Sequence, residues 1–240
     1  MNIKITISYD GSKFNGSSIQ PHTTTVQGSF EKALRSLGID SKTTFSSRTD
    51  KNVHATNQVL NLFIPDFWND LKKLHYKLNK LLGNYIQVKS IKKVDDDFHA
   101  RFSAKKRVYR YILSTKPTTP FNTNYIYYHK NLNIKLLQNS IKYFIGKHDF
   151  EYFSKTGSDP NTTIREIFDA KVYQYKEFII IKFCANAYLR SQIRMMVDFL
   201  LKISDKKLSI DDLKDQLTKK RRVSNKLAPP NGLYLNKVYY

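Results

Sequence analysis

The stretch that decides the fold is residues 42–64, which read KTTFSSRTDKNVHATNQVLNLFI. Alternating apolar residues predict a strand at 57–64, and a shorter strand is predicted at 42–47. The loop between these strands carries Arg48 and Asp50. Loops that strands fix at both ends are common places for catalytic side chains. A carboxylate beside a guanidinium can act as a nucleophile, although such a pair in a loop is more often a structural ion pair.

The elements around this stretch follow an order that occurs twice along the chain. Helices predicted at 26–38 and 69–83 each place their apolar residues on one face, and strands are predicted at 3–9 and 85–94. The first half therefore has the order β-α-β-β-α-β. The second half repeats this order. Strands are predicted at 107–115, 164–175, 177–184 and 233–240, and helices at 134–145 and 188–203.

This repetition predicts an α+β fold of two tandem ferredoxin-like (βαββαβ) units. We expect an N-terminal unit at residues 1–104 and a C-terminal unit at residues 105–240. The longer irregular stretches at 147–162 and 218–231 are candidates for contact with nucleic acid.

Composition favours a polyanionic partner. The chain has 41 Lys and Arg against 20 Asp and Glu, which gives a formal charge of +21, and nucleic acid is the leading candidate for its partner. We find no lipidation signal or basic amphipathic helix that would favour a membrane surface. The single cysteine, Cys184, cannot form an intramolecular disulfide, and the chain starts with a strand-like segment instead of a signal peptide. We therefore expect a cytoplasmic protein.

Several motifs occur in the order in which a known family has them. They are Tyr9–Gly16, Thr25–Gly28, Arg48–Asp50, Asp97–Ala104, Arg107–Tyr111, Ala185–Arg190 with Arg194, and Ala228–Leu235. Together they resemble the tRNA pseudouridine synthase A family over nearly all 240 residues. The resemblance implies two antiparallel sheets flanking a central cleft, a homodimer, and an enzyme that needs no cofactor or metal. Its implied activity is the conversion of uridine to pseudouridine at positions 38, 39 and 40 of the tRNA anticodon stem-loop.

The resemblance also assigns roles to three catalytic residues. Asp50 matches the catalytic carboxylate, Arg194 the basic residue paired with it, and Tyr109 the ring that stacks on the target base. Arg194 could instead be a surface charge, but the apolar Ile193 and Met196 around it predict a buried turn, in which a lone Arg would be costly. Tyr109 could equally belong to an aromatic ladder on a half-buried sheet.

Other residues are candidates for substrate binding. Arg48 matches a residue that helps to lever the nucleotide out of its stack, and Leu189 matches the apolar residue that closes the uracil pocket. Basic residues that could contact phosphates are Lys51, Arg101, Lys105 and Arg107. A second basic run, Lys219–Arg222, is either a set of phosphate contacts or a solvated helix end. The six histidines show no paired spacing for zinc.

The chain departs from the family pattern at three places. Gly16-Ser17-Ser18 replaces a segment that usually carries a tryptophan, Lys51-Asn52 replaces Ala-Gly, and Asp198 replaces a glycine. Asn is the commonest substitute for Gly at positive φ, so we expect the turn at Asn52 to be preserved. Two alternative functions remain open: a non-catalytic RNA-binding protein of ferredoxin-like fold, and a synthase of the same fold with a different RNA target.

Overall fold

The computed structural model describes residues 1–157 and 160–240, which form two compact units. Unit 1 comprises Met1–Lys105 with Tyr234–Tyr240, and unit 2 comprises Lys106–Leu233. The α+β fold class is confirmed. The units differ from the expected halves in two respects. Lys105 belongs to unit 1, and the last strand of the chain also groups with unit 1, where it pairs with β3.

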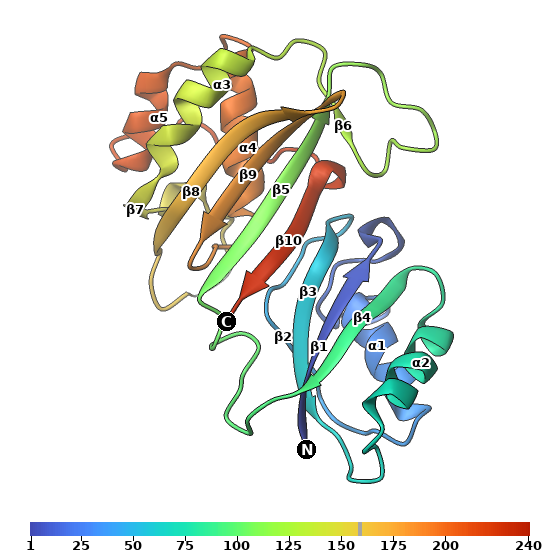
Figure 1. Cartoon of the computed structure of the whole chain (residues 1–240). Helices are drawn as coiled ribbons and strands as arrows, with labels where there is room; N and C mark the ends of the chain where they lie inside the picture. The colour runs from blue at the N-terminus through green and yellow to red at the C-terminus, as the bar shows by residue number, and fades with distance from the viewer. Residues whose placement is uncertain (158–159) are drawn as a thin grey trace. The chain divides into compact units, whose positions relative to one another are not determined.

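Unit 1 has the predicted order of elements (Figure 1). Its elements are β1 (Asn2–Tyr9), the 3-10 helix η1 (Gly11–Lys13), α1 (Val26–Arg35), β2 (Thr44–Phe45), β3 (His54–Phe63), α2 (Leu71–Leu82) and β4 (Ile86–Lys93). β1 lies between β4 and β3 and is antiparallel to both, and β2 pairs with β3. β10 (Leu233–Tyr239) runs parallel to β3, with Tyr234 opposite His54.

The elements of unit 1 form because apolar residues recur at the spacing of each element. Alternate residues of β1, among them Ile3 and Ile5, are fully buried on the face that the helices cover. α1 turns Phe30 and Leu34 toward this face, and the hydroxyl of Thr25 caps its first turn by accepting from Gly28 N. The result is a two-layer unit with one core between sheet and helices.

Unit 2 has a sheet of β5 (Lys106–Ser114), β9 (Phe178–Ala185), β8 (Ile164–Tyr175) and β7 (Gly146–Asp149), paired antiparallel in that order. The helices lie on one face of this sheet (Figure 1). The remaining elements are β6 (Tyr127–Tyr128), α3 (Ile134–Ser140), η2 (Ile141–Phe144), η3 (Glu151–Phe153), α4 (Gln192–Ser204), α5 (Ile210–Leu217) and η4 (Pro230–Gly232). Buried phenylalanines, including Phe144 and Phe153, pack edge to face at 5.4 Å between the sheet and the helices.

The structure differs from the predicted elements of unit 2 in several ways, and it adds the short strands β6 and β7, which were not predicted. The helix expected from residue 188 begins only at Gln192, because Ser191 has a left-handed backbone (φ 57°). The helix expected to reach 145 changes into a 3-10 helix after Ser140. α5 was not expected at all.

Two further points concern the described residues. Each of their helices is too short or too polar to cross a membrane. Part of the irregular stretch predicted at 147–162 is regular, because it contains the end of β7 and all of η3, and its residues 158–159 lie outside the description.

Candidate active site

Asp50 lies on the loop that joins β2 to β3 in unit 1. Its side chain is half-buried, and its backbone carbonyl accepts a hydrogen bond from Val53 N at 3.1 Å. Arg48 and Lys51 are exposed on the same loop. Asn52 has φ 64°, which confirms that asparagine takes the left-handed position of this turn.

The residue before Asp50 is fixed by three hydrogen bonds. The Thr49 hydroxyl lies 2.8 Å from the Tyr9 hydroxyl, Thr49 N donates to Ser17 Oγ at 2.8 Å, and Ser17 N donates to Thr49 O at 3.0 Å. Ser17 is buried. Gly16 (φ 95°) permits this close approach, since a Cβ atom there would lie 3.1 Å from Thr49 O. The segment Gly16-Ser17-Ser18, which lacks the family's tryptophan, therefore holds the Asp50 loop in place through hydrogen bonds to Thr49.

Gln58 of β3 fixes the start of the loop, and the sequence alone did not identify it. Its side chain is fully buried. Gln58 Oε1 accepts from Ser46 Oγ at 2.7 Å, and Nε2 donates to Ser47 O at 2.8 Å. The available signal was an amide residue among the apolar residues of a strand, because a buried amide must find partners.

The end of the loop is held by His54 and Gly11. Gly11 N donates to His54 Nδ1 at 3.0 Å, and the imidazole stacks on Tyr234 with a centroid distance of 4.7 Å. Asp10 Oδ1 lies 3.4 Å from the same nitrogen, but Nδ1 is the acceptor of the shorter bond from the backbone, so the ring proton is on Nε2. A Cβ atom at Gly11 would lie 2.1 Å from Val53 O. The Asp50 loop is thus anchored at its start, middle and end.

Unit 2 brings Tyr109 of β5 together with the turn that precedes α4. Tyr109 is buried and packs edge-on against Tyr188 at a centroid distance of 5.2 Å. The Tyr188 hydroxyl donates to Arg107 O at 3.4 Å, and burial raises its pKa well above the usual value for tyrosine. Leu189, also buried, follows directly. Tyr109 and Leu189, the two residues expected to enclose uracil, therefore belong to one structural neighbourhood.

Arg194 lies half-buried in the first turn of α4, and the expected buried environment of this turn is confirmed by Ile193 and Met196. Arg194 Nε donates to Ala228 O at 2.8 Å, while Ala228 N donates to Arg194 O at 3.0 Å. These reciprocal bonds fix the stem and the Nε edge of the guanidinium. They also join Ala228, which is near the C-terminus, to the first turn of α4.

Asp198 and Lys202 extend the same face of α4, because they follow Arg194 by four and eight residues. They form an ion pair at 2.8 Å, and Lys202 Nζ also donates to Ser224 Oγ at 2.8 Å. Asp198, which departs from the family's glycine, thus helps to attach the segment that leads to Ala228.

The predicted phosphate contacts have different surroundings. Arg101 and Lys105 are exposed near the end of the first part of unit 1. Arg107 is buried, and its Nη1 donates to Asn186 O at 2.8 Å. This partner is a backbone carbonyl of unit 2, so the geometry favours a role for Arg107 in holding the turn beside Tyr109.

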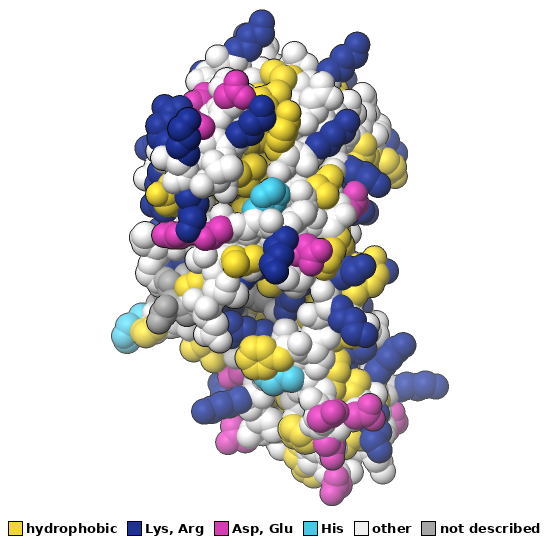
Figure 2. All heavy atoms as spheres, turned by 90° about the vertical axis from the view of Figure 1, so that its left-hand side faces the viewer, with side chains coloured by type: hydrophobic (Ala, Val, Ile, Leu, Met, Phe, Trp, Pro, Cys, Tyr) yellow, Lys and Arg dark blue, Asp and Glu magenta, His cyan; other side chains and the backbone are white. Residues whose placement is uncertain are grey.

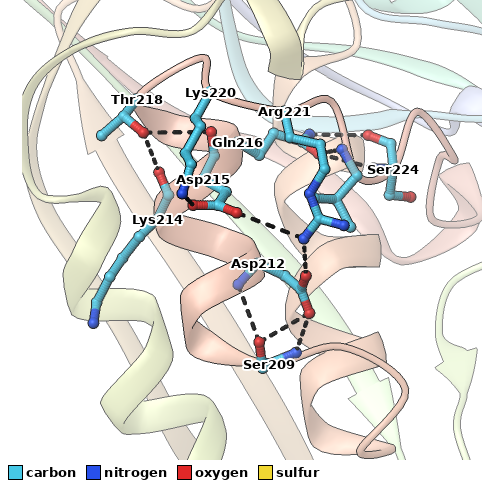
Figure 3. A network of polar contacts seen from close by, with 10 residues as sticks. Ser209, Asp212, Lys214, Asp215, Gln216, Thr218, Lys220, Arg221 and Ser224 are labelled. Atoms are coloured by element: carbon cyan, nitrogen blue, oxygen red, sulfur yellow. Dashed lines mark hydrogen bonds and ion pairs between the residues drawn. The ribbon is translucent and has the colours of Figure 1, made fainter.

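The basic run Lys219–Arg222 is matched by acidic residues of unit 2, as Figure 3 shows for part of it. Its ion pairs are Lys219 with Asp149 (2.6 Å) and Glu151 (3.2 Å), Lys220 with Asp215 (3.6 Å), and Arg221 with Asp212 (2.7 Å) and Asp215 (3.5 Å). Arg222 lies over the Tyr152 ring at 4.7 Å. The buried Gln216 of α5 also bonds to both backbone polar groups of Ser224, at 2.8 and 2.9 Å. The run therefore attaches the segment after α5 to α5 itself and to acidic residues of β7 and η3.

Positive charge is widely distributed on the described surface. On the face shown in Figure 2, Lys and Arg side chains lie over both compact units, with Asp and Glu side chains among them. Among the described residues, no cluster of three or more His, Cys, Asp or Glu side chains could hold a metal ion.

Comparisons with known proteins agree with the motifs. A model of the tRNA pseudouridine synthase family matches residues 5–103 and 140–240. The chain is 44% identical over 240 residues to tRNA pseudouridine synthase A of Campylobacter jejuni (strain 81116), with 100% of both chains covered. It is 38% identical to the enzyme of that name from Wolinella succinogenes (98% of this chain, 92% of the other) and 38% identical to that of Helicobacter pylori strain 26695 (99% and 98%). The chain therefore belongs to the tRNA pseudouridine synthase A family.

Proposed function

We propose that this protein isomerises uridine to pseudouridine at positions 38, 39 and 40 of the tRNA anticodon stem-loop, with Asp50 as the catalytic carboxylate. Family membership supports an isomerase that acts on tRNA. The observation that carries the residue assignment is the anchored Asp50 loop, in which Thr49 is bonded to both Tyr9 and Ser17. A loop fixed in this way holds a reactive side chain in place before substrate arrives.

The reaction breaks the bond from C1′ to N1, turns the uracil over, and joins C1′ to C5. The hydrogen on C5 leaves as a proton, N1 gains one, and nothing is oxidised. Asp50 acts at the sugar, either by covalent attack at C1′ or by removal of a proton at C2′. Both routes require an ionised carboxylate and a detached base that stays in the pocket.

In this proposal Arg194 keeps Asp50 ionised. A site that excludes water raises the pKa of a carboxylate unless a cation lies close to it. The Arg194 Nε–H is bonded to Ala228 O, so the proposal assigns the pairing with the carboxylate to the Nη groups. Tyr109, held edge-on by Tyr188, stacks on the uracil, and Leu189 closes the pocket.

The remaining candidates act on the rest of the tRNA. Arg48, exposed two residues before Asp50, helps to turn the nucleotide out of its stack. Lys51, Arg101 and Lys105, which are also exposed, contact phosphates. We further propose a homodimer that acts in the cytoplasm, as the family resemblance implies, and light scattering of the purified protein tests the dimer.

The substitution Asp50→Asn tests the central assignment. It removes the charge and keeps the shape, so we expect no product and nearly unchanged tRNA affinity. Product is measured as tritium released from tRNA that carries 5-tritiated uridine. Asp66→Asn, in a fully exposed residue of the same unit, is the matched control and should keep full activity.

Three other results of the tritium-release assay would each contradict part of the proposal. Full turnover by Asp50→Asn refutes the catalytic assignment. Absence of tritium release by the wild-type protein indicates a non-catalytic RNA-binding protein. Release from RNA whose modified positions lie outside the anticodon stem-loop indicates a different target.

A further inference from the structure

The turn at residues 98–103 is unusually well fixed for a surface segment. His99 N donates to Ser103 Oγ at 3.1 Å, and Ser103 N donates to His99 O at 2.9 Å. His99 Nδ1 accepts from the backbone N–H groups of Arg101 and Phe102, both at 3.2 Å. Both of these bonds use Nδ1 as the acceptor and so tie the imidazole to the backbone of the turn.

The turn is also attached to the sheet of unit 1. Asn61 of β3 accepts from Ala100 N at 2.8 Å and donates to Phe98 O at 3.1 Å. Asn2 of β1 donates to the same carbonyl at 3.1 Å. The geometry of the turn is thus set by two buried side chains of the core.

This fixed turn presents an aromatic ring to solvent. Phe102 stacks on His99 with a centroid distance of 4.4 Å and an angle of 27°, yet 75% of the residue is exposed. The Arg101 guanidinium lies 5.4 Å from the centre of the ring. A large apolar side chain that is held rigidly in water loses the benefit of burial unless a partner covers it.

We propose that Phe102, supported by His99 and flanked by Arg101, is a stacking platform for an unpaired nucleobase of the tRNA substrate. Every nucleobase offers a flat apolar face, and aromatic rings and guanidinium planes are the usual surfaces on which proteins stack unpaired bases. The base is one other than the target uracil, whose stacking partner is Tyr109. The inference rests on the proposed function, because that function supplies tRNA as the partner.

The Phe102 ring adds no charge of its own to a surface where Arg101 and Lys105 are the proposed phosphate contacts. Residues 95–106 contain three Asp (95, 96 and 97) and three Lys or Arg (101, 105 and 106), so their formal charges cancel. A contact that releases few counterions is nearly independent of salt. The platform should therefore add affinity without changing the salt dependence of tRNA binding.

Fluorescence anisotropy with labelled tRNA over a salt series tests the platform. Stacking of one base contributes about 1–3 kcal/mol, so Phe102→Ala should raise the Kd about 5- to 150-fold, with a log–log salt plot parallel to that of the wild type. Phe102→Trp should bind like the wild type. Phe121→Ala is the matched control, because Phe121 is 91% exposed on a loop of unit 2, and it should leave the Kd unchanged.

Anticodon stem-loop RNAs with single abasic positions identify the base. In the RNA that lacks it, wild type and Phe102→Ala should bind equally. The platform is refuted if Phe102→Ala has the wild-type Kd. If this variant is in addition a monomer where the wild type is a dimer, the ring is covered by a second copy of the chain. Tritium release by the wild type is measured separately, so a failed platform is distinguishable from a failed enzymatic assignment.

Discussion

At the residue scale, Thr49 fixes the position of the proposed catalytic residue beside it, because its hydroxyl and both of its backbone polar groups have partners in other segments. Its neighbour Asp50 is consequently placed by the backbone. Ser17, which lies 32 residues earlier, supplies two of these bonds. A sequence shows that Ser17 departs from a family pattern but not that it faces Thr49, because hydrogen bonds between distant segments leave no periodic signal.

Asn52 is the residue whose backbone conformation the sequence did predict. Left-handed backbone costs an L-residue with a Cβ about 1–2 kcal/mol, and asparagine and glycine tolerate it best. We therefore expect Asn52→Ala to lower the free energy of unfolding by about 1 kcal/mol, while Asn52→Gly stays near the wild type. Urea unfolding followed by circular dichroism measures both.

The control for this prediction is Asn139→Ala, in the exposed part of α3. There the same substitution improves helix propensity, so stability should rise slightly. Equal losses at positions 52 and 139 would show that the amide side chain, and not the backbone of the turn, determines the effect.

At the scale of elements, the first half was predictable because each element has an apolar face of the right period. α5 was missed because its eight residues have few apolar positions, namely Ile210, Leu213 and Leu217. Its signal was the pair Ser209 and Asp212, which form a capping box. The late start of α4 could not be foreseen, since nothing in the residue type of Ser191 indicates a positive φ.

The capping box of α5 gives a prediction about pH. The backbone N–H and hydroxyl of Ser209, followed by Arg221, lower the pKa of Asp212 below the usual value for aspartate. A carboxyl group with a lower pKa in the folded state stabilises the protein above the unfolded pKa of about 4 and loses that contribution as the pH falls through its folded pKa. Asp212→Ala should therefore lower the free energy of unfolding by about 1 kcal/mol at pH 7 and by less at pH 3, which lies below the unfolded pKa.

Denaturant unfolding at both pH values measures this difference. Asp211→Ala is the control, because Asp211 is exposed and pairs with Lys214, and such surface pairs contribute little. A loss at Asp212→Ala that is the same at pH 3 and pH 7 would contradict a charge-dependent cap.

At the scale of the whole molecule, the formal charge of +21 overstates the charge available to RNA. The sequence predicted the excess of basic residues but not which of them have acidic partners, because those partners are set by packing. Lys219, Lys220 and Arg221 bind Asp and Glu side chains of their own unit. By contrast, Lys51 is exposed on the Asp50 loop.

This difference should appear in the salt dependence of tRNA binding. If six phosphate contacts form, the slope of log K against log salt should be about −4 to −5. Lys51→Gln should bring the slope closer to zero by about one unit, because it removes one contact that releases counterions. Lys220→Gln removes the same formal charge from a residue paired with Asp215, so the slope should barely change. Filter binding between low and moderate salt measures the slopes, and equal shifts for the two variants would mean that net charge alone, and not the pairing of individual side chains, governs the encounter with tRNA.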